Sequence, residues 1–298
     1  MMKCLQTLKE HKDSVMYLII TPDGQNLLSG SRDNTIKVWD LNTGQLKTTL
    51  EGHESWVFCI AIRPDGKLAI SGSEDNTLKL WDLEKGEMRY SMQGEGGTIF
   101  SVVITPDGKR AITANSDNTL KYWDLQPGRY LRTIEGHTDW VNSMAITTDG
   151  NMIVTGSNDK TIKIWDVQSW KVIDTFPGHT AGVNSVAITP NGQMIVSGGA
   201  DQTVRVWEFK TGKHLHTLQG HTNLITSVTV TPNGKYIVST GKDNLIKIWD
   251  IYTGELMETF TGHEKWVNYA TVTPDGQKII TAGRDSCIKI WEWDNSNQ

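Results

Sequence analysis

Residues 27–40 read LLSGSRDNTIKVWD, and this stretch recurs down the whole chain at a fixed spacing. The tryptophan near its end reappears every 42 residues, without an insertion anywhere. The seven equivalent tryptophans are Trp39, Trp81, Trp123, Trp165, Trp207, Trp249 and Trp291. One repeat unit therefore accounts for nearly all of the 298 residues.

The second copy shows what one unit should form. Residues 56–62 are apolar nearly throughout, as expected for a strand that is covered on both faces. Pro64-Asp65-Gly66 is a turn signal, because proline presets φ and glycine accepts a positive φ. Segments 67–72, 77–82 and 88–92 complete a predicted set of four short antiparallel strands.

A period in the forties, with Gly-His early and Trp-Asp late, is typical of propeller blades. On these residues the chain resembles the WD-repeat family of β-propellers, and the resemblance covers all seven copies. It implies an all-β fold, in which residues 1–298 form a single closed seven-bladed β-propeller with four antiparallel strands per blade. The near-identity of the copies is similar to that of a prokaryotic or consensus-like member.

The register also predicts how the ring closes. The last copy stops just after its third strand, at Trp291, and the equivalent of its missing outer strand lies at residues 3–9. The N-terminal segment should therefore complete the last blade, as it does in the family that the chain resembles. Deleting residues 1–9 should cause a large loss of stability.

Each copy has a Ser or Thr ten residues before its Trp and an Asp six residues before it. Six copies also have a His in the loop that leads into the innermost strand, here called the lead-in loop. The resemblance implies a structural tetrad in which Trp donates to the hydroxyl, the hydroxyl bonds to His, and His bonds to Asp. The six complete tetrads are His11, Ser29, Asp33, Trp39; His53, Ser71, Asp75, Trp81; His137, Thr155, Asp159, Trp165; His179, Ser197, Asp201, Trp207; His221, Ser239, Asp243, Trp249; and His263, Thr281, Asp285, Trp291.

The same residue types occur in hydrolase triads. Six equivalent sets, with no group to form an oxyanion hole and no copy that stands out, disfavour that interpretation. No nucleophile motif, metal cluster or phosphate loop occurs either, so no catalytic residue, metal or cofactor is expected, and the chain is predicted not to be an enzyme.

The third copy departs from the pattern, because it combines Glu95 with Thr113, Asp117 and Trp123. Two explanations stay open: simple decay of one tetrad, or a glycine-rich loop loosened for binding. Both predict that Glu95 turns toward solvent and that its loop is the most mobile on its face. Replacing Glu95 with His should stabilise the protein.

The composition argues against a nucleic-acid-binding protein and against a membrane protein. The net charge is -5 and the basic residues are spread over all repeats, so no nucleic-acid partner is expected. The apolar runs are too short to span a bilayer, and the N-terminus lacks an apolar signal region. We therefore expect a cytoplasmic monomer with no membrane partner. Cys4, Cys59 and Cys287 have no metal-like spacing, and three free thiols are predicted.

Positions that vary between the repeats on one face could specify a partner. Just before the tetrad Asp stand Arg32, Glu74, Ser116, Asn158, Ala200, Lys242 and Arg284. Three residues after the His position stand Ser14, Trp56, Thr98, Trp140, Gly182, Leu224 and Trp266. Two residues further on stand Met16, Phe58, Phe100, Asn142, Asn184, Thr226 and Asn268.

From these positions we predict a partner-binding arc on one rim. Its candidate residues are Arg32, Trp56, Glu74, Trp140, Lys242, Trp266 and Arg284. Aromatic and Arg side chains are enriched in interface hot spots, and Arg pairs carboxylate or phosphate bidentately. The hypothesis is that the arc engages an acidic or phosphorylated peptide, although Asp13, Glu54 and Glu264 interrupt it; ordinary solvated rim charges are the alternative. On the opposite face, Trp170 replaces a turn glycine and is either a contact residue or an accident.

The favoured function is a protein–protein interaction scaffold that binds a peptide or protein on this rim, because propellers of the resembled family mostly serve that way. One alternative is an idealised or recently duplicated propeller without a dedicated partner, and another is a sensor domain cut from a larger protein. An enzyme or small-ligand binder in the central channel is the least favoured.

Overall fold

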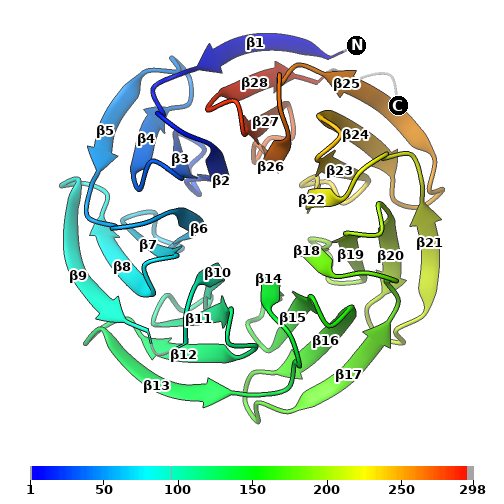
Figure 1. Ribbon diagram of the computed structural model, residues 1–298, viewed down its shortest axis with the longest axis horizontal. Helices are drawn as coiled ribbons and strands as arrows, with labels where there is room; N and C mark the ends of the chain where they lie inside the picture. Colours follow the sequence, from blue (N-terminus) through cyan, green and yellow to red (C-terminus); the bar gives the residue numbers. More distant parts are fainter. Residues whose placement is uncertain (1, 95, 294–298) are drawn as a thin grey trace.

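The computed structural model describes residues 2–94 and 96–293. It places 28 strands in seven four-stranded sheets around a central axis (Figure 1). The described residues contain no helix, and hence none long and apolar enough to cross a bilayer. The prediction of a closed, seven-bladed, all-β propeller is confirmed.

Every blade is built from the same four strand positions. The innermost strands are β2 (Val15–Ile20), β6 (Val57–Ile62), β10 (Ile99–Ile104), β14 (Val141–Ile146), β18 (Val183–Ile188), β22 (Ile225–Val230) and β26 (Val267–Val272). The second strands are β3 (Asn26–Ser31), β7 (Leu68–Ser73), β11 (Arg110–Asn115), β15 (Met152–Ser157), β19 (Met194–Gly199), β23 (Tyr236–Gly241) and β27 (Lys278–Gly283). The third strands are β4 (Ile36–Asp40), β8 (Thr77–Asp82), β12 (Leu120–Asp124), β16 (Thr161–Asp166), β20 (Val204–Glu208), β24 (Leu245–Asp250) and β28 (Ile288–Glu292). The outer strands are β5 (Leu46–Leu50), β9 (Glu87–Gln93), β13 (Arg129–Ile134), β17 (Val172–Pro177), β21 (His214–Leu218), β25 (Leu256–Thr261) and, for the last blade, β1 (Lys3–Leu8).

The hydrophobic core lies between blades. Between the first two blades, Leu28, Ile36 and Leu50 of one sheet pack against Val57 and Trp81 of the next. All seven repeat tryptophans are buried, with at most 5% of each residue exposed. A single blade therefore cannot bury its own faces and depends on its neighbours, as in other repeat architectures.

Strand β1 closes the ring. It pairs antiparallel with β28, with Leu8 opposite Ile288 and Lys3 opposite Glu292. Leu8 is buried in a cluster that also holds Val15 and Trp39 of the first blade and Ile290 of the last. Figure 1 shows β1 beside β28 at the outer edge of the last blade. The predicted closure by the N-terminal strand is thus confirmed.

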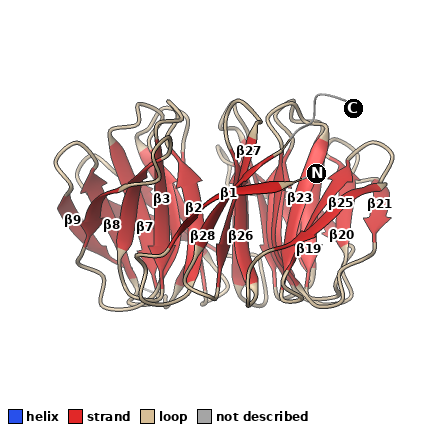
Figure 2. Ribbon diagram, turned by 90° about the horizontal axis from the view of Figure 1, so that it is seen from above, coloured by secondary structure: helices blue, strands red, loops and turns tan. Residues whose placement is uncertain are grey.

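The loops lie at the two faces of the ring, seen edge-on in Figure 2. In the turns between the first and second strands, the predicted Gly66 and its six equivalents, such as Gly24, all have φ near +70°. The residue after the tetrad Asp also adopts a positive φ in every blade, although none of these residues is glycine; Asn34 and Lys160 are two of them. The sequence pattern had not indicated this second left-handed position.

All three cysteines are free, as predicted. Cys4 lies opposite Trp291, whereas Cys287 precedes Ile288, the partner of Leu8 at the other end of β1. The two thiols are therefore held at opposite ends of one strand pair. Cys59 is fully buried, and burial raises the pKa of its thiol well above the usual range.

Candidate functional site at the channel mouth

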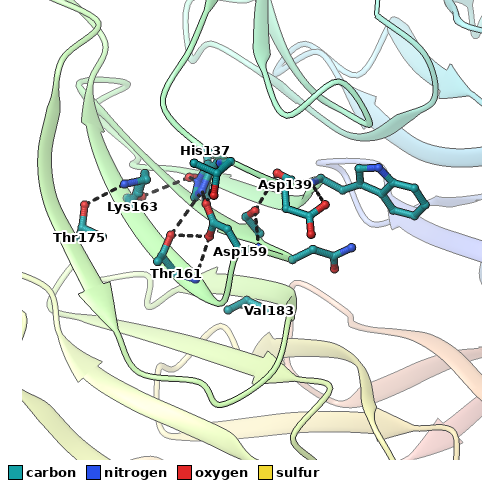
Figure 3. A network of polar contacts seen from close by, with 12 residues as sticks. His137, Asp139, Asp159, Thr161, Lys163, Thr175 and Val183 are labelled. Atoms are coloured by element: carbon teal, nitrogen blue, oxygen red, sulfur yellow. Dashed lines mark hydrogen bonds and ion pairs between the residues drawn. The ribbon is translucent and has the colours of Figure 1, made fainter.

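The six complete tetrads have one geometry. In the fourth blade, Trp165 Nε1 donates to Thr155 Oγ1 at 2.8 Å, and His137 Nε2 lies 2.7 Å from the same oxygen. His137 Nδ1 lies 2.7 Å from Asp159 (Figure 3). The other five sets repeat this within a few tenths of an ångström. Each chain of bonds joins the lead-in loop, the second strand, the tight turn and the third strand of a blade.

The tetrad carboxylates are held in their ionised form. Burial alone would raise the pKa of Asp159, but hydrogen bonds from His137 and Thr161 outweigh it and lower that pKa well below the usual range (Figure 3). The pKa values of the other five tetrad aspartates are lowered by the same balance of burial against hydrogen bonds.

A hydrolytic role does not fit these groups. The tetrad hydroxyls have no exposed surface, as Ser29 and Thr155 illustrate. Each already accepts a hydrogen bond from a tryptophan. A nucleophile must reach its substrate, so buried hydroxyls at these positions serve the scaffold.

The third blade satisfies its tetrad differently. Asn115 Nδ2 donates to Thr113 Oγ1 at 3.3 Å and to the carbonyl of Thr119 at 3.2 Å, so it contacts the hydroxyl without linking it to Asp117 as a histidine would. Lys121 Nζ lies 3.0 Å from Asp117 Oδ2 and is almost completely buried. In five other blades the equivalent lysine instead donates to a hydroxyl of the outer strand, as Lys163 does. The predictions on Glu95 itself lie outside the described residues.

The predicted rim positions are brought together in pairs. In every blade, the N–H of the residue before the tetrad Asp donates to the carbonyl of the residue three after the His position, at 2.8–3.0 Å. Arg284 is thus bonded to Trp266, Glu74 to Trp56, and Lys242 to Leu224. This backbone hydrogen bond occurs in all seven blades. In each blade it holds two side chains, whose identity differs from blade to blade, next to each other on the same face of the ring.

Cations stack on two of the predicted tryptophans. The guanidinium of Arg32 lies 3.9 Å from the ring centroid of Trp56 on the next blade. Trp266 holds two cations, Arg284 of its own blade and Lys242 of the preceding blade, each at 4.2 Å. We call Arg32, Lys242 and Arg284 the basic arc, and the aromatic faces fix the positions of its charges.

The basic arc has no counter-charge in contact. Across residues 2–94 and 96–293, none of its three members forms an ion pair, and Arg32 Nε is buried without a hydrogen-bond partner. Burial and repulsion by Arg284 lower the pKa of Arg32, while Asp13 and Glu74 oppose this. Burial and the two arginines lower the pKa of Lys242. An anion placed here would relieve that repulsion.

The third variable set has a structural cause that the sequence did not reveal. In each innermost strand the register skips one residue, which makes a β-bulge. The skipped residue is Met16, Phe58, Phe100, Asn142, Asn184, Thr226 or Asn268, the members of that set. A bulge redirects a side chain, and all seven of these side chains line one cavity at the end of the central channel. We call this end of the channel the channel mouth.

Four of the seven bulge residues tie neighbouring blades together. Asn142, Asn184 and Asn268 donate to the carbonyls of Val183, Ile225 and Val15 at 2.7–2.9 Å. Thr226 does the same to Val267. From the sequence, variation at these positions could specify a partner; in four blades the side chain also holds the next blade by a hydrogen bond.

A row of aromatic rings runs along the mouth from the second blade to the fourth. Ring centroids are separated by 6.1 Å between Trp56 and Phe58, and by 5.5 Å both between Phe58 and Phe100 and between Phe100 and Trp140. We call these four residues the aromatic wall. Trp140 is 48% exposed, and the other large apolar side chains with comparable exposure in the described chain lie on outer strands or the turn before one.

The basic arc and the aromatic wall meet at a cavity of about 430 Å³. Its lining includes Arg32, Lys242 and Trp266 from the first, sixth and seventh blades, and Phe58 and Phe100 from the second and third. No cluster of His, Cys, Asp and Glu suited to a metal occurs among the described residues. Trp170 lies away from this site, half-buried against Tyr122 with a centroid distance of 4.8 Å and a φ of +57°.

Comparisons with known proteins agree with this architecture. The family model described as "WD domain, G-beta repeat" matches residues 2–40, 44–82, 86–124, 128–166, 170–208, 212–250 and 254–292. The transcriptional repressor rco-1 of Neurospora crassa is 43% identical over 42 residues, which are 14% of this chain and 7% of the relative. Protein Notchless of Drosophila melanogaster is 44% identical over 41 residues, or 14% and 8%.

The vegetative incompatibility protein HET-E-1 of Podospora anserina is 49% identical over 41 residues, or 14% of this chain and 3% of the relative. Each of these matches is about one repeat long and spans less than a tenth of the relative. The family match, in contrast, runs through all seven blades. The chain therefore belongs to the WD-repeat family.

Proposed function

We propose that this propeller is a protein-interaction module that binds an acidic or phosphorylated segment of its partner at the basic arc. WD-repeat propellers typically act as protein-interaction scaffolds, and they are generally not enzymes. The observation that carries the proposal is the convergence of Arg32, Lys242 and Arg284 on one rim without a carboxylate in ion-pair contact.

The stacked tryptophans support this role. Ordinary solvated rim charges extend freely into water, whereas Trp266 holds two cations and Trp56 holds one. Charges held in this way lose less side-chain entropy when they bind, which favours affinity. Arginine can pair a carboxylate or phosphate bidentately, and the partly buried arc strengthens such a pair relative to one in water.

The test compares three variants against any partner captured by the wild-type protein. Arg32→Ala combined with Arg284→Ala, and separately Trp266→Ala, should each weaken binding at least about tenfold. The control is Trp170→Gly, which restores the residue usual at that turn, and it should bind like wild type. Melting curves establish that each variant is folded. Undiminished affinity in both arc variants would remove the arc from the proposed function.

Salt provides a second readout. An interaction dominated by the basic arc weakens as ionic strength rises, because exposed charges are screened within about 8–10 Å at 0.1–0.15 M salt. The wild-type protein should show a steep salt dependence and the double arginine variant a shallow one. Equal slopes would show that the partner does not use these charges.

A further inference from the structure

We infer that the ligand segment has a second determinant, an apolar side chain that enters the channel mouth against Phe58 and Phe100 while its acidic neighbour rests on the basic arc. This inference rests on the proposed function and names the partner segment more closely. An extended peptide with an acidic residue and an aromatic or branched apolar residue a few positions apart is the ligand that fits both halves of the mouth.

The aromatic wall supplies the apolar contact. Phe58 and Phe100 are bulge residues, so their rings stand at the mouth of the channel instead of between blades. Both remain partly exposed. The cavity of about 430 Å³ lies within the roughly 300–1,000 Å³ usual for ligand sites and has room for one large apolar side chain.

The asparagines at three other bulge positions of the mouth supply peptide contacts. Each of Asn142, Asn184 and Asn268 uses Nδ2 to reach a carbonyl of the next blade. That bond requires the nitrogen to face the neighbouring blade, and it leaves Oδ1 as an acceptor with no donor among the described residues. Three such acceptors on side chains that line the cavity suit the N–H groups of an extended main chain.

The charges and aromatic rings around the cavity disfavour ligands of other chemistry. A cationic side chain would meet Arg32 and Lys242, which already repel each other. A wholly apolar segment would leave Arg32 Nε buried and unpartnered, as it is in the free protein. A small anion would satisfy the arc but leave the aromatic wall and the three asparagine oxygens without contacts.

The structure itself provides a conservative variant. Asn is the residue that the fold accepts at the equivalent position of three other blades. The double variant Phe58→Asn/Phe100→Asn should keep the propeller folded. Its new amides should donate to the backbone carbonyls of Ile99 and Val141, as Asn142 donates to the carbonyl of Val183. They remove the aromatic wall at the cavity without touching the basic arc.

The experiment selects from a random twelve-residue peptide library displayed on phage, against the intact chain. Four proteins are compared: wild type, Phe58→Asn/Phe100→Asn, Arg32→Ala/Lys242→Ala/Arg284→Ala, and Trp170→Gly as the control. Wild type and control should enrich peptides with an acidic residue within about four positions of an apolar one. The first variant should lose the apolar preference alone, and the second the acidic preference.

Synthetic peptides from the wild-type pool then give affinities by fluorescence anisotropy. Replacing the apolar residue by Ala should weaken binding to wild type about 10- to 100-fold, the range expected for burying a large apolar side chain. It should change binding to Phe58→Asn/Phe100→Asn much less. Glutamate and phosphoserine forms of the same peptide distinguish a carboxylate from a phosphate ligand.

The outcomes separate the two proposals. An acidic preference without an apolar one, or an apolar preference unchanged in Phe58→Asn/Phe100→Asn, overturns the inference and leaves the proposed function standing. An apolar preference without an acidic one contradicts the proposed function and, with it, the paired ligand. Failure of wild type to enrich any sequence contradicts both.

Discussion

At the scale of single residues, equivalent lysines make different contacts in different blades. Lys163 ties two strands by donating to Thr175, whereas Lys121 pairs with Asp117 in the blade that has no tetrad histidine. Asn115 donates to the hydroxyl of Thr113. The third blade therefore makes contacts at Thr113 and Asp117 that the complete tetrads do not, and both explanations of its departure, decay or a loop loosened for binding, stay open.

This difference in contacts predicts unequal costs for one substitution. Lys121→Met should destabilise the protein by about 1 kcal/mol more than Lys163→Met, because it leaves the Asp117 carboxylate without its charged partner, while the second variant loses a single hydrogen bond to a hydroxyl. Urea denaturation of both variants measures the difference. Equal midpoints would show that the Lys121–Asp117 pair adds nothing.

The same contacts refine the prediction for Glu95→His. A histidine there should stabilise most when Asn115→Ser is made with it, because serine stands at the equivalent positions Ser31, Ser73 and Ser157 and frees Thr113 for the imidazole. The double variant should gain about 1–2 kcal/mol from two buried hydrogen bonds. Thermal melts of both variants test this, and a melting temperature below that of wild type in the double variant would contradict it.

Acid should unfold the protein through the six tetrad aspartates. Their native pKa values are depressed below the unfolded value of about 3.9, so their contribution to stability is complete above about pH 4 and is lost as pH falls toward the native pKa. The urea concentration at which half of the protein is unfolded should fall steeply as the pH is lowered from about 4 to about 2. Asp201→Asn should be less stable at pH 7 and should show a smaller loss over that range.

At the scale of elements, β1 differs from every other outer strand because no covalent turn joins it to the blade that it completes. Its attachment depends on pairing with β28 and on the burial of Leu8 between the last and first blades. Burial increases along β1, so Leu5, at the register shift between Cys4 and Gln6, is exposed and Leu8 is buried. The ring is thus held shut by strand β1, by the apolar contacts around Leu8 and by the hydrogen bond from Asn268 of the last blade to Val15 of the first.

Deleting residues 1–9 should therefore lower the melting temperature strongly. A finer test is Leu8→Ala, which should cost about 2–5 kcal/mol as a core truncation, against Leu5→Ala, which should stay within about 0.5 kcal/mol. Thermal and urea melts measure both. Similar stabilities for the two alanine variants would mean that the closure does not depend on the buried face of β1.

At the scale of the whole molecule, the two faces and the outer edge carry different chemistry. Among the described residues, the large exposed apolar side chains other than Trp140, such as Ile173 and Leu256, are spread over the outer strands and the turn before one, whereas Trp140 lies on the rim of the channel mouth. Scattered apolar residues of this kind are normal on monomers, whereas a concentrated patch marks an interface. The channel mouth is where basic and aromatic residues concentrate.

We accordingly predict that the protein is a monomer in solution. Sedimentation equilibrium should give a mass near 33.3 kDa, independent of concentration in the micromolar range. A concentration-dependent dimer that dissociates in Trp140→Ser would instead show that the aromatic wall binds a second copy of the chain.

The sequence by itself determined the repeat, the number of blades, the four strands of each blade and the closure by residues 3–9. These features are local or periodic: a tryptophan every 42 residues and turn glycines with positive φ leave little freedom. It also identified the tetrad members and the rim positions that vary. Strand bounds in the second blade differ from the prediction by one residue at most.

Only the tertiary structure decided which variable side chains meet. The bulge that turns Phe58 toward the channel, the stacking of Lys242 and Arg284 on Trp266, and the bond from Asn142 to the next blade all join residues of different strands or blades. Lys121 could be assigned to Asp117 only once its distance was known. Repeat spacing specifies each blade, but ring closure brings the blades into contact, and the channel mouth exists only after the ring has closed.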